Sequence, residues 1–309
     1  MDYVHSIARI RAHLTDIGWL RFFLNLGLIS ATKQCDKPLP PANNRCDKVC
    51  RINSRGDGLW TYRCPRAMCR QKFTVLKGTF FDFFQLRPNK VMEVIIGWIL
   101  KYTTDTITRE TEVERHTVAH IVRRCRELLA AWLRYQTVKI GGPHHTVEVD
   151  ESAFGRRKYN RGRRTRVKWV VGGIDRTTKQ TFLCMAPRGR RNSRTLRTII
   201  QRYVRPFTKI VTDGWPAYHR LNRAGMAYTH VVVNHRRNMV DPNDRTIHTQ
   251  NIESHWSKVK RSLRRRIGKM SVQHFETYLV EYMWRGGASK TPEELFQSFV
   301  DAMKHFHPA

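Results

Sequence analysis

The sequence predicts an α/β fold for the second half of the chain, because strand-like and helix-like segments alternate after residue 143. Gly141-Gly142-Pro143 stands directly before this alternation and is typical of a domain boundary. Hydrophobic residues make up 40% of the chain, which is enough for a folded core. A length of 309 residues exceeds what a single compact core usually needs, so we expect two or three structural units.

The first half is expected to be mainly helical, with a cysteine-rich segment in the middle. Residues 1–34 are predicted to form an N-terminal helical region, since apolar residues recur there at helical spacing. Residues 35–85 form a predicted zinc-ribbon-like segment that closes with short strands at 72–76 and 78–81. Residues 86–142 carry apolar stripes that indicate a helical, helix-turn-helix-like region.

Beyond residue 143 the predicted order is three strands, a helix, a strand, a helix, a strand and a helix, which is the order of an RNase H-like domain. The strands are expected at 146–151, 167–175, 180–186, 208–213 and 228–234. The helices are expected at 193–204, 215–224 and 250–266, followed by closing helices at 271–285 and 292–305. We therefore place this domain at 143–285 and a C-terminal helix at 286–309.

The charge of the chain indicates a polyanionic partner. Its 57 Lys and Arg residues outnumber 25 Asp and Glu residues, which gives a formal net charge of +32. A ribosomal-type cationic protein and a membrane-surface binder are the alternatives, while eight Trp and fourteen Phe argue against a disordered basic tail. No membrane contact is expected, because the apolar run from Val91 to Leu100 is too short to span a bilayer. No cleavable signal peptide is visible in the first thirty residues.

Basic residues concentrate in the expected helix at 115–130, in a run at 156–168, before the helix at 193–204, and after residue 257. The run at 156–168 has no acidic residue and predicts a hairpin arm along DNA; a nuclear import signal or a solvated loop is the alternative. The candidate DNA contacts are Arg115, Arg123, Arg124, Arg156, Arg157, Lys158, Arg161, Arg163, Arg164, Arg190, Arg191, Lys258, Lys260, Arg261 and Arg264. Contacts in this number predict a steep salt dependence of binding.

Three carboxylates stand where a metal site for phosphodiester chemistry needs them. Asp150 and Asp213 each end an apolar strand-like run, and Glu253 lies near the start of a patterned helix. Hard oxygen ligands hold Mg²⁺ or Mn²⁺, and two such ions activate a nucleophile and stabilise a leaving oxygen. Without metal the three carboxylates would repel one another. The alternative is a set of ordinary acids at strand ends, where turns favour Asp.

Three polar residues on the expected helix at 250–266 and just before it extend this candidate site. Lys260 lies seven residues, or about two helical turns, after Glu253 and is expected to hold a DNA phosphate. A solvated helix charge is its alternative role. His248 and Asn251 could contact metal or phosphate, or could cap the helix.

The cysteines predict a reduced compartment and a structural zinc site. Three residues separate Cys46 from Cys50, and four separate Cys64 from Cys69. Four thiolates from two turns can surround a tetrahedral zinc ion, and Cys35 is a possible substitute for Cys46 or Cys50. Free buried thiols are the alternative.

A series of ordered motifs carries a family resemblance. The motifs are Val149-Asp150-Glu151-Ser152, Val171-Gly172-Gly173-Ile174-Asp175-Arg176, Thr212-Asp213-Gly214-Trp215 with Tyr218, Val233-Asn234-His235, and His248-Thr249-Gln250-Asn251-Ile252-Glu253-Ser254-His255-Trp256 with Lys260. Together they resemble the ISXO2-like (IS1595-type) DDE transposases, whose eukaryotic branch is the Merlin superfamily.

The resemblance implies an RNase H-like catalytic domain with Mg²⁺ or Mn²⁺ and cut-and-paste DNA transposition. The implied acidic triad falls on Asp150, Asp213 and Glu253, with Lys260 as the following basic residue. Some relatives use Asn as the third ligand, so Asn251 is a rival to Glu253. A zinc-ribbon-like segment is also implied, although the gap between Cys46 and Cys50 departs from the usual two residues.

We therefore expect a transposase that binds terminal inverted repeats, cleaves DNA and joins 3′ ends to target DNA. A catalytically silent DNA-binding regulator and a structure-selective nuclease are the alternatives. Double-stranded DNA is the expected partner, and a homodimer or higher assembly on paired ends is the expected oligomer. The expected location is the nucleus, or the nucleoid if the host is bacterial.

Overall fold

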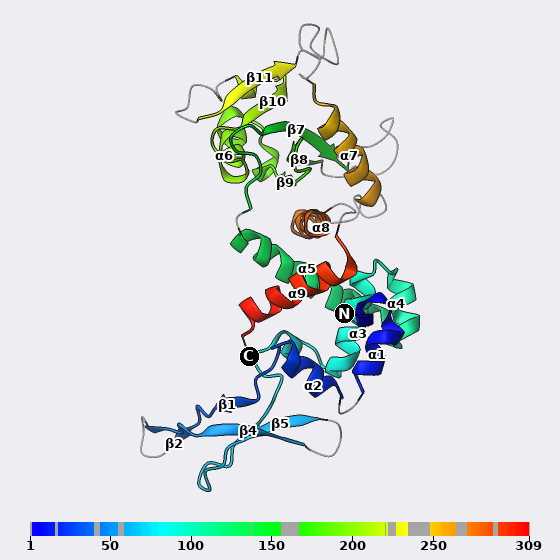
Figure 1. Cartoon of the computed structure of the whole chain (residues 1–309), viewed down its shortest axis with the longest axis vertical. Helices are drawn as coiled ribbons and strands as arrows, with labels where there is room; N and C mark the ends of the chain where they lie inside the picture. Colours follow the sequence, from blue (N-terminus) through cyan, green and yellow to red (C-terminus); the bar gives the residue numbers. More distant parts are fainter. Residues whose placement is uncertain are drawn as a thin grey trace. The chain divides into compact units, whose positions relative to one another are not determined.

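A computed structural model shows two compact units, one of residues 1–128 with 290–309 and one of residues 129–289 (Figure 1). The sequence-based division differs, because it set a boundary near residue 142 and gave the C-terminal helix a segment of its own. The structure describes residues 2–15, 18–39, 44–54, 59–136, 138–155, 167–219, 221, 227–233, 248–263, 271–286 and 290–308.

The helices of the first unit pack around an aromatic core. They are η1 (Asp2–His5), α1 (Ile7–His13), α2 (Gly18–Asn25), α3 (Pro88–Ile99), α4 (Thr104–Thr111), the larger part of α5 (Arg115–Gln136) and α9 (Pro292–Phe306). Phe299 of α9 is fully buried and lies 5.6 Å from Trp98 of α3 between ring centroids. Burial of this apolar stripe explains why α9 belongs to the first unit and does not stand alone.

The cysteine-rich segment of the first unit forms a small antiparallel sheet. Its order is β1-β4-β5-β6, with bounds β1 (Thr32–Gln34), β4 (Val49–Ser54), β5 (Trp60–Arg63) and β6 (Lys72–Thr74), beside a hairpin of β2 (Pro38–Leu39) and β3 (Asn44–Arg45). The strand expected at 78–81 is wrong, because 3-10 helix η2 (Phe80–Phe83) takes its place. The Thr79 hydroxyl caps this turn by accepting from the Phe81 N–H at 3.2 Å, and Phe80 and Phe81 are both buried.

A five-stranded mixed sheet is the centre of the second unit, which confirms the predicted α/β fold class. Its order is β11-β10-β7-β8-β9, with bounds β7 (Thr146–Phe154), β8 (Lys168–Asp175), β9 (Thr181–Met185), β10 (Lys209–Asp213) and β11 (Thr229–Val233). The first three strands along the chain pair antiparallel, while β10 pairs parallel with both β7 and β11. The predicted strands agree with these bounds to within a few residues.

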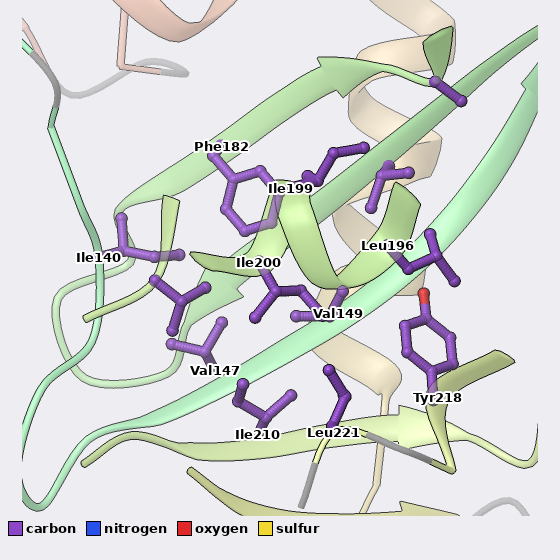
Figure 2. Close-up of a cluster of buried hydrophobic side chains, with 13 residues drawn as sticks. Ile140, Val147, Val149, Phe182, Leu196, Ile199, Ile200, Ile210, Tyr218 and Leu221 are labelled. Atoms are coloured by element: carbon purple, nitrogen blue, oxygen red, sulfur yellow. The ribbon is translucent and has the colours of Figure 1, made fainter. Parts of the chain in front are cut away.

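Helices cover both faces of this sheet (Figure 1). Helix α6 (Ser193–Tyr203) buries Leu196, Ile199 and Ile200 against Val147 and other side chains of one face, as Figure 2 shows. Helices α7 (Gln250–Leu263) and α8 (Val272–Trp284) pack on the other face. The amphipathic pattern of each helix therefore fixes a three-layer arrangement.

Two expectations about helices in this unit fall partly outside the described residues. The helix expected at 215–224 is a 3-10 turn, η5 (Pro216–Tyr218), where the structure describes it. Residues 264–270, which include the end of the helix expected at 250–266, are not among the described ones. Across the described residues, none of the helices is long and apolar enough to cross a membrane.

Candidate active site and metal centre

Two of the three candidate acids lie on neighbouring parallel strands. The pairing of β7 with β10 sets Val211 opposite Glu148. Two residues further along both strands, the same register brings Asp213 beside Asp150. Because side chains alternate along a strand, both carboxylates project from the same sheet face as Glu148.

Helix α7 lies close to that face because β8 carries a glycine there. Gly172 pairs with Asp150 in the ladder between β7 and β8. A Cβ atom at Gly172 would lie 2.6 Å from the indole of Trp256, so a larger residue would displace that ring. In this space Trp256 donates a hydrogen bond from Nε1 to Asp150 Oδ2 at 3.0 Å. The bond ties the orientation of the Asp150 carboxylate to the position of α7.

The first turn of α7 is held by a buried carboxylate that the sequence reasoning missed. Glu148 is fully buried, and its Oε2 accepts from the Ile252 N–H at 2.9 Å. Its Oε1 accepts from Asn251 Nδ2 at 2.7 Å and from Arg176 Nε at 2.7 Å. A carboxylate at a helix N-terminus satisfies free N–H groups and interacts favourably with the helix dipole. Glu148 therefore fixes where α7 begins.

The two polar residues at the head of α7 contribute to the same anchor. His248 Nδ1 lies 3.5 Å from Glu148 Oε1, and the His248 carbonyl accepts from Arg176 Nη2 at 2.5 Å. The Asn251 amide is engaged by Glu148 as well. Both residues thus belong to the contacts that hold the start of the helix. His248 Nδ1 accepts from the Gln250 N–H at 3.4 Å, which is a capping contact, whereas Asn251 donates to Glu148.

The third candidate acid, Glu253, lies in the first turn of α7 and is exposed. Its Oε1 accepts a hydrogen bond from Thr249 Oγ1 at 3.2 Å. The pKa of Asp150 is raised to about 6. Burial is the largest cause, and the negative charges of Asp213 and Glu253 contribute to the same shift. Asp213 and Glu253 therefore both lie close enough to act electrostatically on Asp150.

A fourth carboxylate, Glu151, follows Asp150 in the chain and was not among the predicted site residues. Burial raises its pKa to about 7, and the charges of Asp150 and Asp213 add to this shift. The buried Tyr218 hydroxyl lies close enough to act in the opposite direction and lower the pKa of Glu151. No well-aligned hydrogen bond forms at Glu151 Oε1 or at this hydroxyl. Val147 and Val149 pack in the core between the sheet and α6. Because side chains alternate along a strand, the sequence could have placed Glu151 on the same sheet face as these two residues.

The three acids have the ligand chemistry of a site for divalent ions. In the part of the chain that the structure describes, only four cysteines have ligand atoms that all lie within 4.8 Å of one another, so the acids are spaced more widely. Two ions about 4 Å apart with bonds of about 2 Å accommodate outer ligand oxygens up to roughly 8 Å apart. Carboxylate oxygens are the ligands that Mg²⁺ and Mn²⁺ prefer.

The candidate basic residues of α5 are engaged by acids on their own unit. Arg115 forms an ion pair with Asp105, and both side chains are exposed. Arg123 and Arg124 both pair with Glu127, at 2.9 and 3.0 Å. Such exposed pairs exchange readily, so these arginines remain candidate contacts.

The remaining candidate basic residues belong to the second unit. Lys258, Lys260 and Arg261 are exposed on α7, and Lys260 Nζ lies 5.8 Å from the Phe154 ring centroid at the end of β7. Arg190 and Arg191 lie in the turn between β9 and α6. The candidates that lie outside the described residues are Arg156, Arg157, Lys158, Arg161, Arg163, Arg164 and Arg264.

A cluster of four buried thiols lies in the first unit, and it differs from the predicted set in one member. The four sulfurs belong to Cys35, Cys46, Cys64 and Cys69, which all lie within 4.8 Å of one another. Cys35 takes the position that the prediction gave first to Cys50. The reason is the β2–β3 hairpin, which brings Cys35 and Cys46 together, whereas Cys50 sits within β4 opposite Lys33.

The geometry of the thiol cluster fits a tetrahedral zinc ion. Cys35 and Cys69 have their sulfurs 3.6 Å apart, and so have Cys46 and Cys64. Tetrahedral zinc–sulfur bonds of about 2.3 Å separate the sulfurs by roughly 3.8 Å. Without metal, the N–H of Lys48 lowers the pKa of the Cys46 thiol to about 7, whereas burial raises the pKa of the Cys35 and Cys64 thiols.

Comparison with known proteins gives a family match over most of the second unit. A family model described as "ISXO2-like transposase domain" matches residues 140–286. Among curated proteins, male abnormal protein mab-31 of Caenorhabditis elegans is 24% identical over 183 residues, covering 54% of this chain and 40% of that protein. The chain thus spans less than half of that relative's length.

Solved structures give weaker global similarity. The Mos1 strand transfer complex matches at 12% identity with a TM-score of 0.27, covering 72% of this chain and 78% of that one. The mariner Mos1 paired end complex with Mg matches at 12% identity with a TM-score of 0.21, covering 72% and 79%. A pre-cleavage Mos1 transpososome matches at 14% identity with a TM-score of 0.21, covering 72% and 81%.

Proposed function

Residues 140–286 form an ISXO2-like transposase domain, and from this premise we propose that the chain is a metal-dependent DDE transposase. It binds the terminal inverted repeats of its element, cleaves DNA, and joins the 3′ ends to target DNA. The observation that supports the proposal is that the strand register sets Asp213 beside Asp150, and that the charges of Asp213 and Glu253 act on Asp150.

The sheet supports an RNase H-like catalytic domain. In order of appearance its strands are arranged 5-4-1-2-3, with the first three antiparallel and the last two parallel to the first. The middle of the first strand and the end of the fourth bring two acids together, and a helix packed on that face supplies the third. This arrangement supports the element order from which the RNase H-like fold was predicted.

The residues of the chain have distinct tasks in this proposal. Asp150, Asp213 and Glu253 would hold two Mg²⁺ or Mn²⁺ ions, which supply Lewis-acid activation of the attacking oxygen and stabilise the leaving oxygen. Trp256 orients Asp150 through its hydrogen bond. Glu148 holds the start of α7 and thereby positions Glu253. The exposed Lys260 is proposed to contact a phosphate of the bound strand.

The first unit is proposed to recognise the transposon ends. The zinc ribbon would be completed by a structural ion at Cys35, Cys46, Cys64 and Cys69. Helices α4 and α5 are joined by a short turn with Glu112 in the left-handed conformation at φ 59°, as in a helix-turn-helix. Paired ends require at least two copies of the chain, and a nuclear location stays a prediction.

A strand-transfer assay with pre-cleaved inverted-repeat ends and Mg²⁺ or Mn²⁺ tests the proposal. Wild-type protein should join the ends to target DNA, and Asp150→Asn should abolish joining while leaving end binding intact. Glu276→Gln is the matched control, because Glu276 is an exposed carboxylate on α8 of the same unit. Joining by Asp150→Asn would refute the mechanism. If the wild type binds ends but does not join them, the catalytically silent regulator is favoured. If it cleaves DNA that lacks the inverted repeats, the structure-selective nuclease is favoured.

A further inference from the structure

The turn between β9 and α6 forms a surface hollow rich in hydrogen-bond donors. Pro187 and Ile199 contribute apolar atoms to its lining. The polar lining residues are Arg188, Arg190, Asn192, Arg194, Thr195 and Thr198. Guanidinium, amide and hydroxyl groups together, with no carboxylate among them, have the chemistry of a site for phosphate oxygens.

The arginines of this hollow differ from those of α5 in having no acidic partner. Within the described residues, Arg188, Arg190 and Arg194 take part in no ion pair, whereas Arg115 and Arg123 are each paired with a carboxylate. Like charges crowded in one turn raise the energy of the free protein unless an anion binds there. The unpaired set is therefore suited to an external anion.

The backbone of this turn is held in an uncommon conformation. Arg188 has φ 53° and Gly189 has φ 69°, both in the left-handed region. An arginine rarely adopts such an angle, and strain of this kind is found where a side chain must be held in a particular place. The conformation places Arg188 and Arg190 along the hollow together with Arg194 from the first turn of α6.

Arg191 does not line the hollow and turns toward the acids instead. Its guanidinium carbon lies 3.4 Å from the Trp169 ring centroid and 5.3 Å from that of Trp215. Trp215 is 43% exposed, and its backbone N–H donates to Asp213 Oδ1 at 3.1 Å. Arg191 also acts electrostatically on Glu151. Arg191 therefore lies near Glu151 and near the loop that follows Asp213.

We propose that Arg188, Arg190 and Arg194 bind consecutive backbone phosphates of duplex DNA on its way to the acidic site, and that Arg191 contacts the phosphate next to the reacting one. The inference deepens the proposed transposase function and rests on it. Arg188, Arg190 and Arg194 supply affinity for DNA, whereas Arg191 positions the reacting strand.

Salt titration of DNA binding tests the first part. Each lost phosphate contact lowers the slope of log K against log salt by about 0.9 for duplex and about 0.7 for single strands. The triple variant Arg188→Gln, Arg190→Gln, Arg194→Gln should therefore lose roughly 2.7 units of slope on duplex DNA. The control is Lys179→Gln, Arg202→Gln, Arg205→Gln, which removes the same charge from three exposed residues of the second unit and should leave most of the slope unchanged.

The outcomes separate this inference from the proposed function. An equal loss of slope in both triple variants, or a loss confined to single strands, would overturn the phosphate assignment. Failure of the wild type to bind DNA would overturn the proposed function itself. Circular dichroism should show both variants folded, since all six side chains lie on the surface.

Arg191→Gln tests the second part. At saturating DNA and low salt this variant should join ends roughly tenfold or more slowly, because one charge-assisted contact at the reacting strand is lost. Its salt slope should fall by no more than about one unit. Joining at the wild-type rate under these conditions would show that Arg191 does not position the strand.

Discussion

The thiol cluster of the first unit and the carboxylate cluster of the second are built in opposite ways. The four thiols are buried and lie within 4.8 Å of one another, although hairpins and turns supply most of them. The three carboxylates come from strands and a helix, yet they are more widely spaced and Glu253 is exposed. A closed set of four ligands fits a structural ion, whereas an open set leaves positions for substrate.

The two clusters also differ in what holds them in place. The small sheet around the thiols has few fully buried side chains of its own, of which Tyr62 is the largest. The acids stand on a sheet with a core on each face, and Glu148 anchors the helix that supplies the third acid. We infer that the metal ion stabilises the fold at the first cluster, and that the fold positions the metal ions at the second.

The largest expected effect is the loss of zinc from the first cluster. Cys35→Ser should abolish stoichiometric zinc binding and unfold the segment around β1 to β6, because structural zinc contributes about 10 kcal/mol or more in small zinc domains. Zinc content by mass spectrometry and protease sensitivity of residues 32–74 would measure this. Cys50→Ser is the matched control, since Cys50 is also buried but lies outside the four-sulfur set. Zinc loss in Cys50→Ser alone would reverse the assignment.

A second prediction concerns the anchor of α7. Glu148→Gln removes one partner of a buried ion pair and should lower the free energy of unfolding by about 3 kcal/mol. It should also raise the Mn²⁺ concentration needed for half-maximal joining, because Glu253 is no longer held in place. Glu93→Gln is the control: Glu93 is a buried carboxylate paired with Arg11 at 2.9 Å in the first unit. An unchanged Mn²⁺ requirement in Glu148→Gln would limit Glu148 to a structural role.

The carboxylate cluster should also give the metal-free protein a distinctive pH dependence. The pKa of Asp150 is raised to about 6, so between about pH 4 and 6 the folded state binds more protons than the unfolded state. Stability in EDTA should therefore fall as pH rises through this window, by at most about 3 kcal/mol from Asp150. Urea unfolding at several pH values would measure the fall, and Asp150→Asn should remove part of it. A fall that is identical in Asp150→Asn would contradict the assignment.

The smallest expected effect comes from the indole of Trp256. Trp256→Phe keeps an aromatic ring beside Gly172 but removes the hydrogen bond to Asp150, which should lower stability at neutral pH by about 1 kcal/mol. The pKa of Asp150 should rise further, since a donor to its charged form is lost. An upward shift in the pH midpoint of the stability profile would reveal this, while a downward shift would contradict it.

The alternation of strands and helices was sufficient to predict the α/β class and the five described strands of the second unit. Local patterns carry this information, because strand and helix periodicities are visible within a few residues. The turn at 78–81 was missed, since Phe80 and Phe81 fit a strand pattern until the Thr79 cap and the helical core are known. The place of α9 was missed as well, because only long-range packing assigns it to the first unit.

The site was less accessible to sequence reasoning wherever a residue depends on distant partners. Asp150, Asp213 and Glu253 stood out because acids at strand ends are visible locally, and their catalytic role stays a prediction. Glu148 did not stand out in the sequence, because its partners Asn251 and Ile252 lie more than a hundred residues away along the chain. Cys35 was only a substitute ligand, since the hairpin that brings it to Cys46 leaves little trace in the spacing.

The burial of α9 in the first unit has a consequence for how the protein is made. The second unit is inserted into the first, because the chain leaves the first unit in α5 and returns to it at residue 290. Phe296 and Phe299, which complete the helical core of the first unit, are translated after the whole of the second unit. Translation must therefore pass the whole second unit and α9 before the unit proposed to recognise DNA ends can close its core. A premature stop codon near residue 290 would leave this core incomplete while sparing the second unit.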